Sequence, residues 1–288
     1  MNVVIWAVAV LLGILMSEPS VQAVDANPDK PGSPKLRVAF SSIGQFNPRA
    51  LEPYFAKYKA CFMLSEGEAG PAFAYHAEEC EQRKVPCSTF KIPNSIIGLD
   101  TGVLTDENHL FKWDGTKQFI SDWERDHTLQ SAVQYSVVWY FKKVAAAVGA
   151  ERMREYLKNF DYGNQDMSAG LTQFWLGSPA HGGSLKISAK EQIDFLKKLY
   201  FERLPVKKRS MQIAKRIIVL KQTPYGTLSG KTGSSYKDGK WVLGWFVGYL
   251  VHDKKPYFFA ANIEAEDGAS GPRAREIVEE ILKDAQLL

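Results

Sequence analysis

The chain has 288 residues, of which 45% are hydrophobic and 24% charged, with 36 Lys and Arg against 32 Asp and Glu. This length is ample for a large buried core, and this composition excludes a disordered, collagen-like or coiled-coil chain. The small basic excess is spread along the sequence without clusters, which disfavours a nucleic-acid partner.

The first 23 residues differ from the rest of the chain. An apolar run from Val3 to Met16 is followed by a polar break and the small-x-small ending Val21-Gln22-Ala23. This pattern predicts a secretory signal peptide at 1–23, a leader at 24–34 and a periplasmic or secreted protein without a stable membrane partner. No Lys or Arg precedes the run, so an uncleaved N-terminal anchor is the alternative.

Strand-like runs lie near both ends of the chain, and helical patterns fill its middle. We expect strands at 60–65, 73–76, 219–222, 226–231, 241–250 and 257–263, and helices at 51–58, 88–99, 131–148, 153–160, 189–199 and 275–282. This order predicts a mixed α/β (α+β) fold with one catalytic domain over 24–288 in two lobes. An antiparallel sheet flanked by helices takes up about 35–85 and 184–288, and an all-helical lobe takes up about 86–183, with a cleft between them.

The segment Ser88-Thr89-Phe90-Lys91 carries the first chemical signal, because residues three apart on a helix share a face. A serine hydroxyl needs an adjacent base before it can act as a nucleophile, and a lysine is a base only when it is uncharged. Pro93 belongs in the first turn of a helix, so either Ser88 lies at or near the helix start or the helix is kinked. Unpaired N–H groups there can stabilise an oxyanion.

Three further motifs follow in order: Ser136-Val137-Val138, Tyr162-Gly163-Asn164 and Lys231-Thr232-Gly233. Together with S-x-x-K they resemble the active site of penicillin-recognising serine enzymes. The S-T-F-K-I-P-N form, the Y-G-N motif and Phe174-Trp175-Leu176 resemble the class D β-lactamases, the oxacillinases. The resemblance runs from about Cys61 to the C-terminus and implies the β-lactamase/transpeptidase-like fold.

For the helical lobe, the resemblance implies that Ser88 is the nucleophile and Ser136 shuttles a proton to the lactam nitrogen. It further implies that Lys91 is carboxylated and acts as the general base for both acylation and deacylation. The carbamate pocket is then formed by Phe90, Val138, Trp175 and Leu176. Carbon dioxide or bicarbonate is needed for this modification, and no other cofactor is expected.

On the sheet side, the resemblance implies that Lys231 and Thr232 bind the substrate carboxylate and that the backbone N–H groups of Ser88 and Ser234 meet the oxyanion. The family also places an arginine near the start of the last helix, where either Arg273 or Arg275 meets this expectation. Many relatives carry an aromatic residue directly after K-T-G, whereas this chain has Ser234.

Other motifs suggest structural roles. Tyr162-Gly163-Asn164 is expected to shape the floor of the cleft, or only to end a helix. The family-like segments around Trp113 and Trp123 are expected to serve packing.

The chain has three cysteines, Cys61, Cys80 and Cys87. Export to an oxidising compartment would allow one disulfide, and a short loop could join Cys80 to Cys87, although Cys87 adjoins Ser88. Neither the cysteines nor the five scattered histidines have metal-ligand spacing, so no metal site is predicted.

The predicted function is a secreted class D serine β-lactamase acting on β-lactam substrates, as a monomer or a homodimer. One alternative is a β-lactam sensor domain that is acylated without turnover, although such receptors carry membrane-spanning helices that we do not expect after residue 16. The other is a D-Ala-D-Ala peptidase, which Trp175 disfavours.

Overall fold

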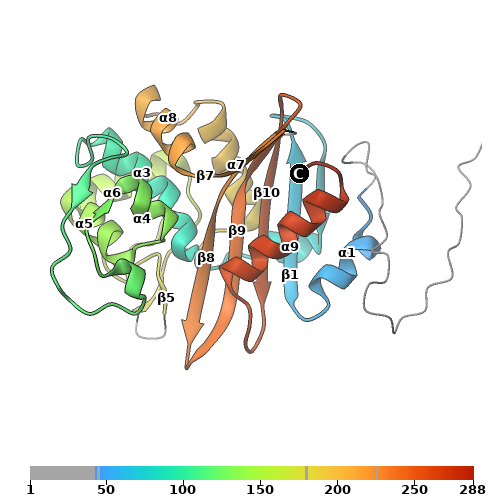
Figure 1. The fold of residues 1–288 in the computed structure, drawn as a ribbon, viewed down its shortest axis with the longest axis horizontal. Coiled ribbons are helices and arrows are strands. Elements are labelled where there is room, and N and C mark those ends of the chain that lie inside the picture. The colour runs from blue at the N-terminus through green and yellow to red at the C-terminus, as the bar shows by residue number, and fades with distance from the viewer. Residues whose placement is uncertain (1–42, 44–45, 179–180, 225) are drawn as a thin grey trace, which may run out of the picture. The chain divides into compact units, whose positions relative to one another are not determined.

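The computed structural model describes residues 43, 46–178, 181–224 and 226–288. The predicted signal peptide and leader lie outside these residues. The centre of the described part is a six-stranded antiparallel sheet with the order β2-β1-β10-β9-β8-β7 (Figure 1). Its strands are β1 (Lys59–Glu66), β2 (Ala72–Tyr75), β7 (Val219–Thr223), β8 (Gly226–Lys237), β9 (Lys240–His252) and β10 (Lys255–Glu264). The predicted mixed α/β (α+β) fold with an antiparallel sheet is confirmed.

Helices cover both faces of this sheet (Figure 1). The α-helices are α1 (Pro48–Phe55), α2 (Ala77–Glu81), α3 (Lys91–Asp100), α4 (Leu129–Gln134), α5 (Val138–Val148), α6 (Ala150–Phe160), α7 (Ala189–Tyr200), α8 (Lys208–Ile217) and α9 (Gly271–Asp284). The structure also contains two 3-10 helices, η2 (Cys87–Phe90) and η3 (Ser121–Trp123). Two short strand pairs lie outside the main sheet: β3 (Leu110–Phe111) pairs with β4 (His127–Thr128), and β5 (Gly177–Ser178) pairs with β6 (His181–Gly182). Helix α9 packs on β8, β9 and β10, while α7 packs on β1, β9 and β10.

Successive side chains of a strand point to opposite faces, and this alternation divides the core into two hydrophobic clusters. On β9, Trp245 and Val247 join the cluster that includes α3 and α5, whereas Phe246 and Leu250 join the cluster beneath α1 and α9. Because both faces are covered, most of β9 and β10 is buried. The register then fixes where the neighbouring strand β8 directs each of its side chains.

The single helix expected over 131–148 is wrong, because the chain forms α4 and α5 with a break at Ser136. Ser136 has φ +58°, and the N–H groups of Ser136 and Val137 donate to Val133 O (3.2 Å) and Ala132 O (2.9 Å). These two bonds form a Schellman ending, a position where glycine is the usual residue. The apolar periodicity continues across the break and concealed it in the sequence.

The disulfide joins Cys61 to Cys80, with 5.1 Å between their Cα atoms, and not Cys80 to Cys87. Cys61 is completely buried on β1, and α2 begins soon after the neighbouring strand β2, which brings Cys80 beside it. Cys87 is a free, buried thiol next to Ser88. The β1–β2 hairpin therefore decides the disulfide partner of Cys80, although Cys87 is nearer to it in the sequence.

Helix α7 begins with a capping box, because Ser188 Oγ accepts from Glu191 N and the Glu191 carboxylate accepts from Ser188 N. Helix α8 was not predicted, and it packs on α3, α4 and α7. Within the described ranges, no helix has the length and apolar character needed to cross a membrane.

Candidate active site

Ser88 and Lys91 lie where η2 runs into α3, and Lys91 Nζ donates a hydrogen bond of 2.8 Å to Ser88 Oγ. Pro93 occupies the first turn of α3, so Ser88 precedes the α-helix, as the proline predicts. The Lys91 side chain is completely buried. Burial, followed by repulsion from Lys231, holds the pKa of Lys91 well below its usual value. Burial therefore favours the neutral form of the amine beside the serine hydroxyl.

A network of short contacts fixes the turn that presents Ser88. Cys87 has φ +52°, a left-handed conformation that turns the chain sharply before the serine. The Thr89 hydroxyl donates to Pro86 O (2.8 Å) and accepts from Gln192 Nε2 (2.9 Å), which ties η2 to α7. The turn is thereby held from both its own backbone and a neighbouring helix.

The sheet supplies Lys231 and Thr232 from β8, which the register pairs with Val247 and Phe246 of β9. Paired residues in antiparallel strands point to the same face, so Lys231 faces the cluster that includes α3, and Thr232 faces α9. Lys231 Nζ donates to Thr232 O at 3.0 Å. Burial and the nearby positive charge of Arg275 lower the pKa of Lys231 to about 7.

Gly233 allows β8 to approach Ser88 closely. A Cβ atom at this position would lie 3.2 Å from Ser88 N and 2.8 Å from Pro86 O, so no side chain fits there. Ser88 and Ser234 line one cavity, called the catalytic cavity below. Ser234 Oγ also accepts a hydrogen bond from Gly271 N (2.8 Å) at the start of α9. The side chain of Ser234 therefore anchors α9. The role predicted for Ser234, contact with the oxyanion, concerns its backbone N–H and not this side chain.

Ser136 projects from the break between α4 and α5 and lines the cavity together with Ser88. Two indole groups hold this segment: Trp123 Nε1 donates to Tyr135 O (2.9 Å), and Trp139 Nε1 donates to Trp123 O (2.8 Å). The acceptor Tyr135 O belongs to the peptide group that precedes Ser136. Trp123, which we had expected to serve packing, thus fixes the backbone at a predicted catalytic residue.

The predicted carbamate pocket contains a buried donor without an acceptor. Trp175 is completely buried and stacks on Phe90, with 5.3 Å between the ring centroids. Its Nε1–H has no hydrogen-bond partner among the described residues. Buried polar groups are seldom left unpaired, and such a donor fits an anion beside it. Val138 and Leu176 line the adjoining cavity.

The Tyr162-Gly163-Asn164 motif braces the loop that carries Trp175 and does not line the catalytic cavity. Tyr162 packs edge-on against Phe90, and Asn164 Nδ2 donates to Ser184 O (2.9 Å) on the far side of that loop. Gly163 passes so close to Lys186 O that an added Cβ would lie 2.1 Å from it. The prediction that this motif shapes the cleft floor is therefore wrong. The motif instead supports the loop that carries Trp175 from outside the cavity.

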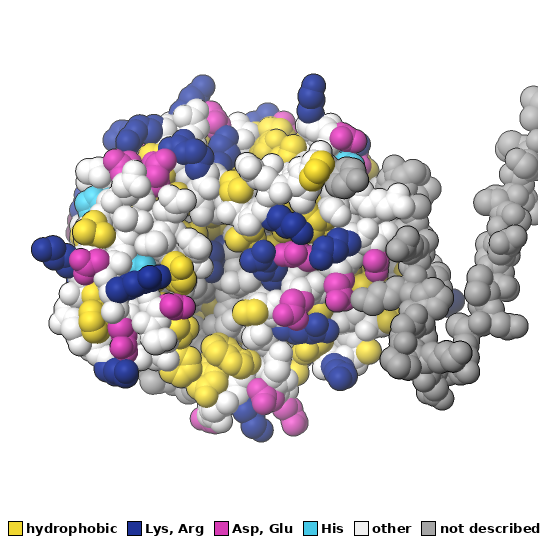
Figure 2. Space-filling model, in the orientation of Figure 1, with side chains coloured by type: hydrophobic (Ala, Val, Ile, Leu, Met, Phe, Trp, Pro, Cys, Tyr) yellow, Lys and Arg dark blue, Asp and Glu magenta, His cyan; other side chains and the backbone are white. Residues whose placement is uncertain are grey.

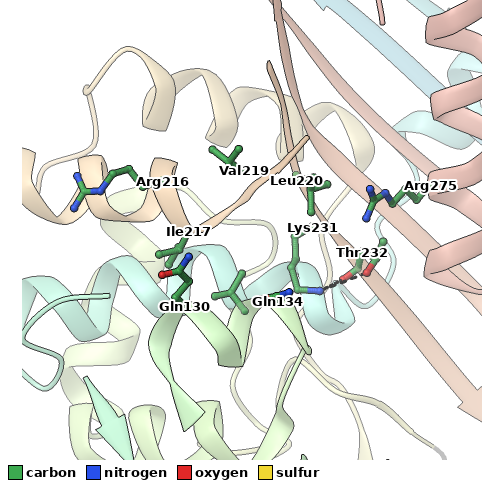
Figure 3. A pocket seen from close by; sticks show the side chains of 11 residues that line it. Gln130, Gln134, Arg216, Ile217, Val219, Leu220, Lys231, Thr232 and Arg275 are labelled. Atoms are coloured by element: carbon green, nitrogen blue, oxygen red, sulfur yellow. Dashed lines mark hydrogen bonds between the residues drawn. The ribbon is translucent and has the colours of Figure 1, made fainter. Parts of the chain in front are cut away.

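The two candidate arginines of α9 point in different directions. Arg275 lines a cavity with Lys231 and Thr232, and Figure 3 shows it directed toward Thr232. Its Nε donates to Glu279 Oε1 (2.6 Å), a bond that uses one of its five donors. Arg273 instead pairs with Glu276 (3.1 Å). The geometry therefore places Arg275 at the site.

The catalytic cavity has a volume of about 620 Å³, and several of its walls come from residues that the sequence did not indicate. These are Phe119, Ile120, Tyr236 and Trp241, which are joined there by Trp123. The Phe119 and Tyr236 rings lie 5.4 Å apart, and Tyr236 and Trp241 lie 4.8 Å apart. Figure 2 shows hydrophobic side chains gathered over this end of the β8–β9 hairpin. Aromatic residues outside the K-T-G motif thus form an apolar wall of the cavity, whereas Ser234, the residue directly after K-T-G, contributes no ring.

No metal site is found in the described part of the chain, where no cluster of His, Cys, Asp or Glu could hold an ion. A cavity-lining serine that contacts a buried lysine, opposite a K-T-G strand, defines an acyl-transfer site of the penicillin-recognising class. In agreement, the profile of the penicillin binding protein transpeptidase domain matches residues 45–283.

Within that class, the comparisons show the family: the chain belongs to the class D β-lactamases. It is 40% identical over 227 residues to the probable beta-lactamase YbxI of Bacillus subtilis, which covers 79% of this chain and 81% of the relative. A solved class D beta-lactamase from Bacillus subtilis is similar at a TM-score of 0.79 and 37% identity, over 86% of this chain and 98% of that one. The regulatory protein BlaR1 of Bacillus licheniformis is 33% identical over 95% of this chain but 43% of its own length.

Proposed function

We propose that this protein hydrolyses β-lactam antibiotics through an acyl-ester on Ser88, with Lys91 as the residue that activates it. The observation that carries the proposal is the 2.8 Å contact between the completely buried Lys91 Nζ and the partly exposed Ser88 Oγ, which lines the cavity. A neutral amine has a lone pair that can accept the hydroxyl proton across this contact. General-base assistance of this kind contributes about a hundred- to ten-thousandfold to a rate.

Acylation then proceeds by attack of Ser88 Oγ on the lactam carbonyl. The backbone N–H groups of Ser88 and Ser234 would meet the oxyanion, which is consistent with the close approach of β8 at Gly233. Ser136 would pass a proton to the lactam nitrogen as the carbon–nitrogen bond breaks. The rigid backbone at Tyr135 supports this role, because proton transfer depends on a fixed donor position.

We also propose that Lys91 is carboxylated. A neutral, buried amine can react with carbon dioxide, and the unpaired Trp175 Nε1–H supplies a donor for the anionic group that results. Once bound, this group would supply an anionic base for the deacylating water. Phe90, Val138 and Leu176 would keep the pocket apolar around it.

On the sheet side, Lys231, Thr232 and Arg275 would bind the carboxylate of the substrate. These three residues converge on one cavity, and arginine is suited to planar recognition of a carboxylate. We further propose export of the protein, which is supported by the apolar run at 3–16 and by the Cys61–Cys80 disulfide, a bond typical of oxidising compartments.

A β-lactam sensor domain is the second candidate, favoured by the similarity to BlaR1. A sensor would undergo the same acylation but would not release the product. The two candidates therefore differ in deacylation alone.

The test is steady-state hydrolysis of a chromogenic cephalosporin by the mature chain, with and without bicarbonate at fixed pH. We expect multiple turnovers that increase with bicarbonate and fall by about a thousandfold or more in Lys91→Ala. Lys190→Ala, which removes an exposed lysine, is the matched control and should leave the rate unchanged. A single burst equal to the enzyme concentration in the native chain would refute the hydrolase and leave a sensor or a D-Ala-D-Ala peptidase.

A further inference from the structure

A second cavity of about 340 Å³ adjoins the catalytic one at the open edge of β8 (Figure 3). Its walls come from α4, the junction of α8 with β7, β8 and α9. Thr232 lines both cavities, whereas Ser88 and Ser136 line only the catalytic one. The proposed carboxylate site therefore lies at the boundary between the two.

Positive charge is concentrated at one end of this second cavity. Lys231 and Arg275 lie beside Thr232, next to the catalytic cavity. Arg216 lines the other part, but its guanidinium is paired with Glu107 at 2.7 Å and is directed away from Lys231 in Figure 3. An anion would thus be held at the boundary, and the remainder of the cavity would receive a group without a charge.

That remainder combines apolar and amide surfaces. Leu220 and Val133 supply aliphatic contacts, and Gln130 and Gln134 from α4 supply amide groups (Figure 3). A flat heteroaromatic ring suits both, because its faces can contact aliphatic side chains and its nitrogen atoms can bond to amides.

The covalent structure of bicyclic β-lactams indicates which group would enter. The carbon that bears the carboxylate is bonded to the lactam nitrogen on one side and to the ring atom that carries the second substituent on the other. The acylamino side chain lies at the opposite end of the bicycle. With the carboxylate at Thr232 and the lactam carbonyl at Ser88, the acylamino arm remains in the catalytic cavity and the second substituent points away from it.

We propose that this second cavity binds the substituent on the ring atom next to the carboxylate-bearing carbon, and that it selects cephalosporins whose substituent there is an uncharged heteroaromatic group. This inference rests on the proposed β-lactam acylation by Ser88. It assigns Leu220, Gln130 and Gln134 to substrate selection.

The test compares two cephalosporins that differ only at this position, one with a methyl group and one with a pyridylvinyl group. Both groups are attached through carbon and do not leave during the reaction. Filling the cavity by Leu220→Trp should lower kcat/KM for the pyridylvinyl compound by about tenfold more than for the methyl compound. Where turnover is slow, the rate of acylation is measured with the same pair.

Lys221→Trp is the matched control, because Lys221 is exposed on the same strand and does not line the cavity. Leu220 is itself 37% exposed, and a Tm equal to that of the native chain reports an intact fold in each variant. An unchanged ratio of the two substrates in Leu220→Trp would overturn this inference while the proposed function stands. If the native chain reacts with neither compound nor with a penicillin, the proposed function fails and the inference fails with it.

Discussion

The helical side and the sheet side of the site contribute one buried lysine each, and the pKa of both lysines is lowered. Lys91, on the helical side, is fully buried, and its pKa lies well below the usual value because of burial and then repulsion from Lys231. Lys231, on the sheet side, is 5% exposed, and burial followed by repulsion from Arg275 lowers its pKa to about 7.

The repulsion runs through three basic residues and ends at Lys91, the residue that contacts Ser88. Arg275 is always charged and lowers the pKa of Lys231, and Lys231 in turn lowers that of Lys91. Burial therefore favours the neutral form of both lysines, and Lys231, with a pKa of about 7, is still partly charged at neutral pH. Similar burial thus accompanies two different proposed roles, carboxylate binding by Lys231 on β8 and activation of Ser88 by Lys91 on α3.

The largest effect that separates the two sides is expected for Arg275→Ala. Removing this guanidinium should raise KM for a penicillin by about ten- to a hundredfold, since a hydrogen bond to a charged group contributes about 1.5–3 kcal/mol. The kcat value should change little, because the Ser88–Lys91 contact lies on the other side. Steady-state kinetics of the purified variant provide the measurement.

Arg273→Ala is the matched control, because Arg273 belongs to the same helix but pairs with Glu276. Its kinetic constants should equal those of the native chain. A rise in KM for Arg273→Ala with none for Arg275→Ala would contradict the assignment of the carboxylate site.

A smaller effect, on the helical side, is expected for Trp123→Phe. Phenylalanine keeps an aromatic wall but cannot donate to Tyr135 O, so the peptide before Ser136 loses its restraint. We expect kcat to fall by about tenfold while KM is retained, because proton transfer and not binding depends on this position.

Trp113→Phe removes an equivalent indole bond, from Nε1 to Thr116 O at 2.9 Å, and Trp113 does not line the catalytic cavity. This control should lose a similar amount of stability, measured as Tm, without the loss of kcat. Equal kcat values for the two variants would show that Trp123 has only a structural role.

The sheet strands could largely be predicted from the sequence, and the break at Ser136 on the helical side could not. Alternating strands and the Asp238-Gly239 turn place K-T-G on β8, and the register then sets the direction of each side chain. On the helical side, the left-handed conformation of Ser136 has no glycine to reveal it, and the apolar pattern runs on without interruption.

Tertiary packing accounts for what the sequence did not resolve. The choice of Arg275 over Arg273 depends on the rotation of α9 against β8, which Ser234 fixes through Gly271. The aromatic wall arises because the loop with Phe119 lies across the β8–β9 hairpin, a long-range contact without a local signal. The Cys61–Cys80 bond likewise depends on the β1–β2 hairpin.

The smallest expected effect concerns pH and compares the two lysines directly. In the free enzyme, Lys231 with a pKa of about 7 is charged below that pH and neutral above it. Carboxylate binding should therefore weaken as the pH rises through 7, and kcat/KM should fall by about tenfold or less, because Thr232 and Arg275 still contact the anion. The kcat value should fall less, since a bound carboxylate raises the pKa of Lys231.

Lys231→Arg keeps the charge at every pH and should remove this basic limb of the kcat/KM profile. Arg275→Ala removes the repulsion on Lys231 and should move the limb to higher pH, even though overall binding is weaker. The acidic limb, in which protonation of Lys91 abolishes its action as a base, should remain in the Lys231→Arg variant, because an arginine still repels charge at Lys91. If the basic limb persists in Lys231→Arg, the limb arises from the titration of a group other than Lys231.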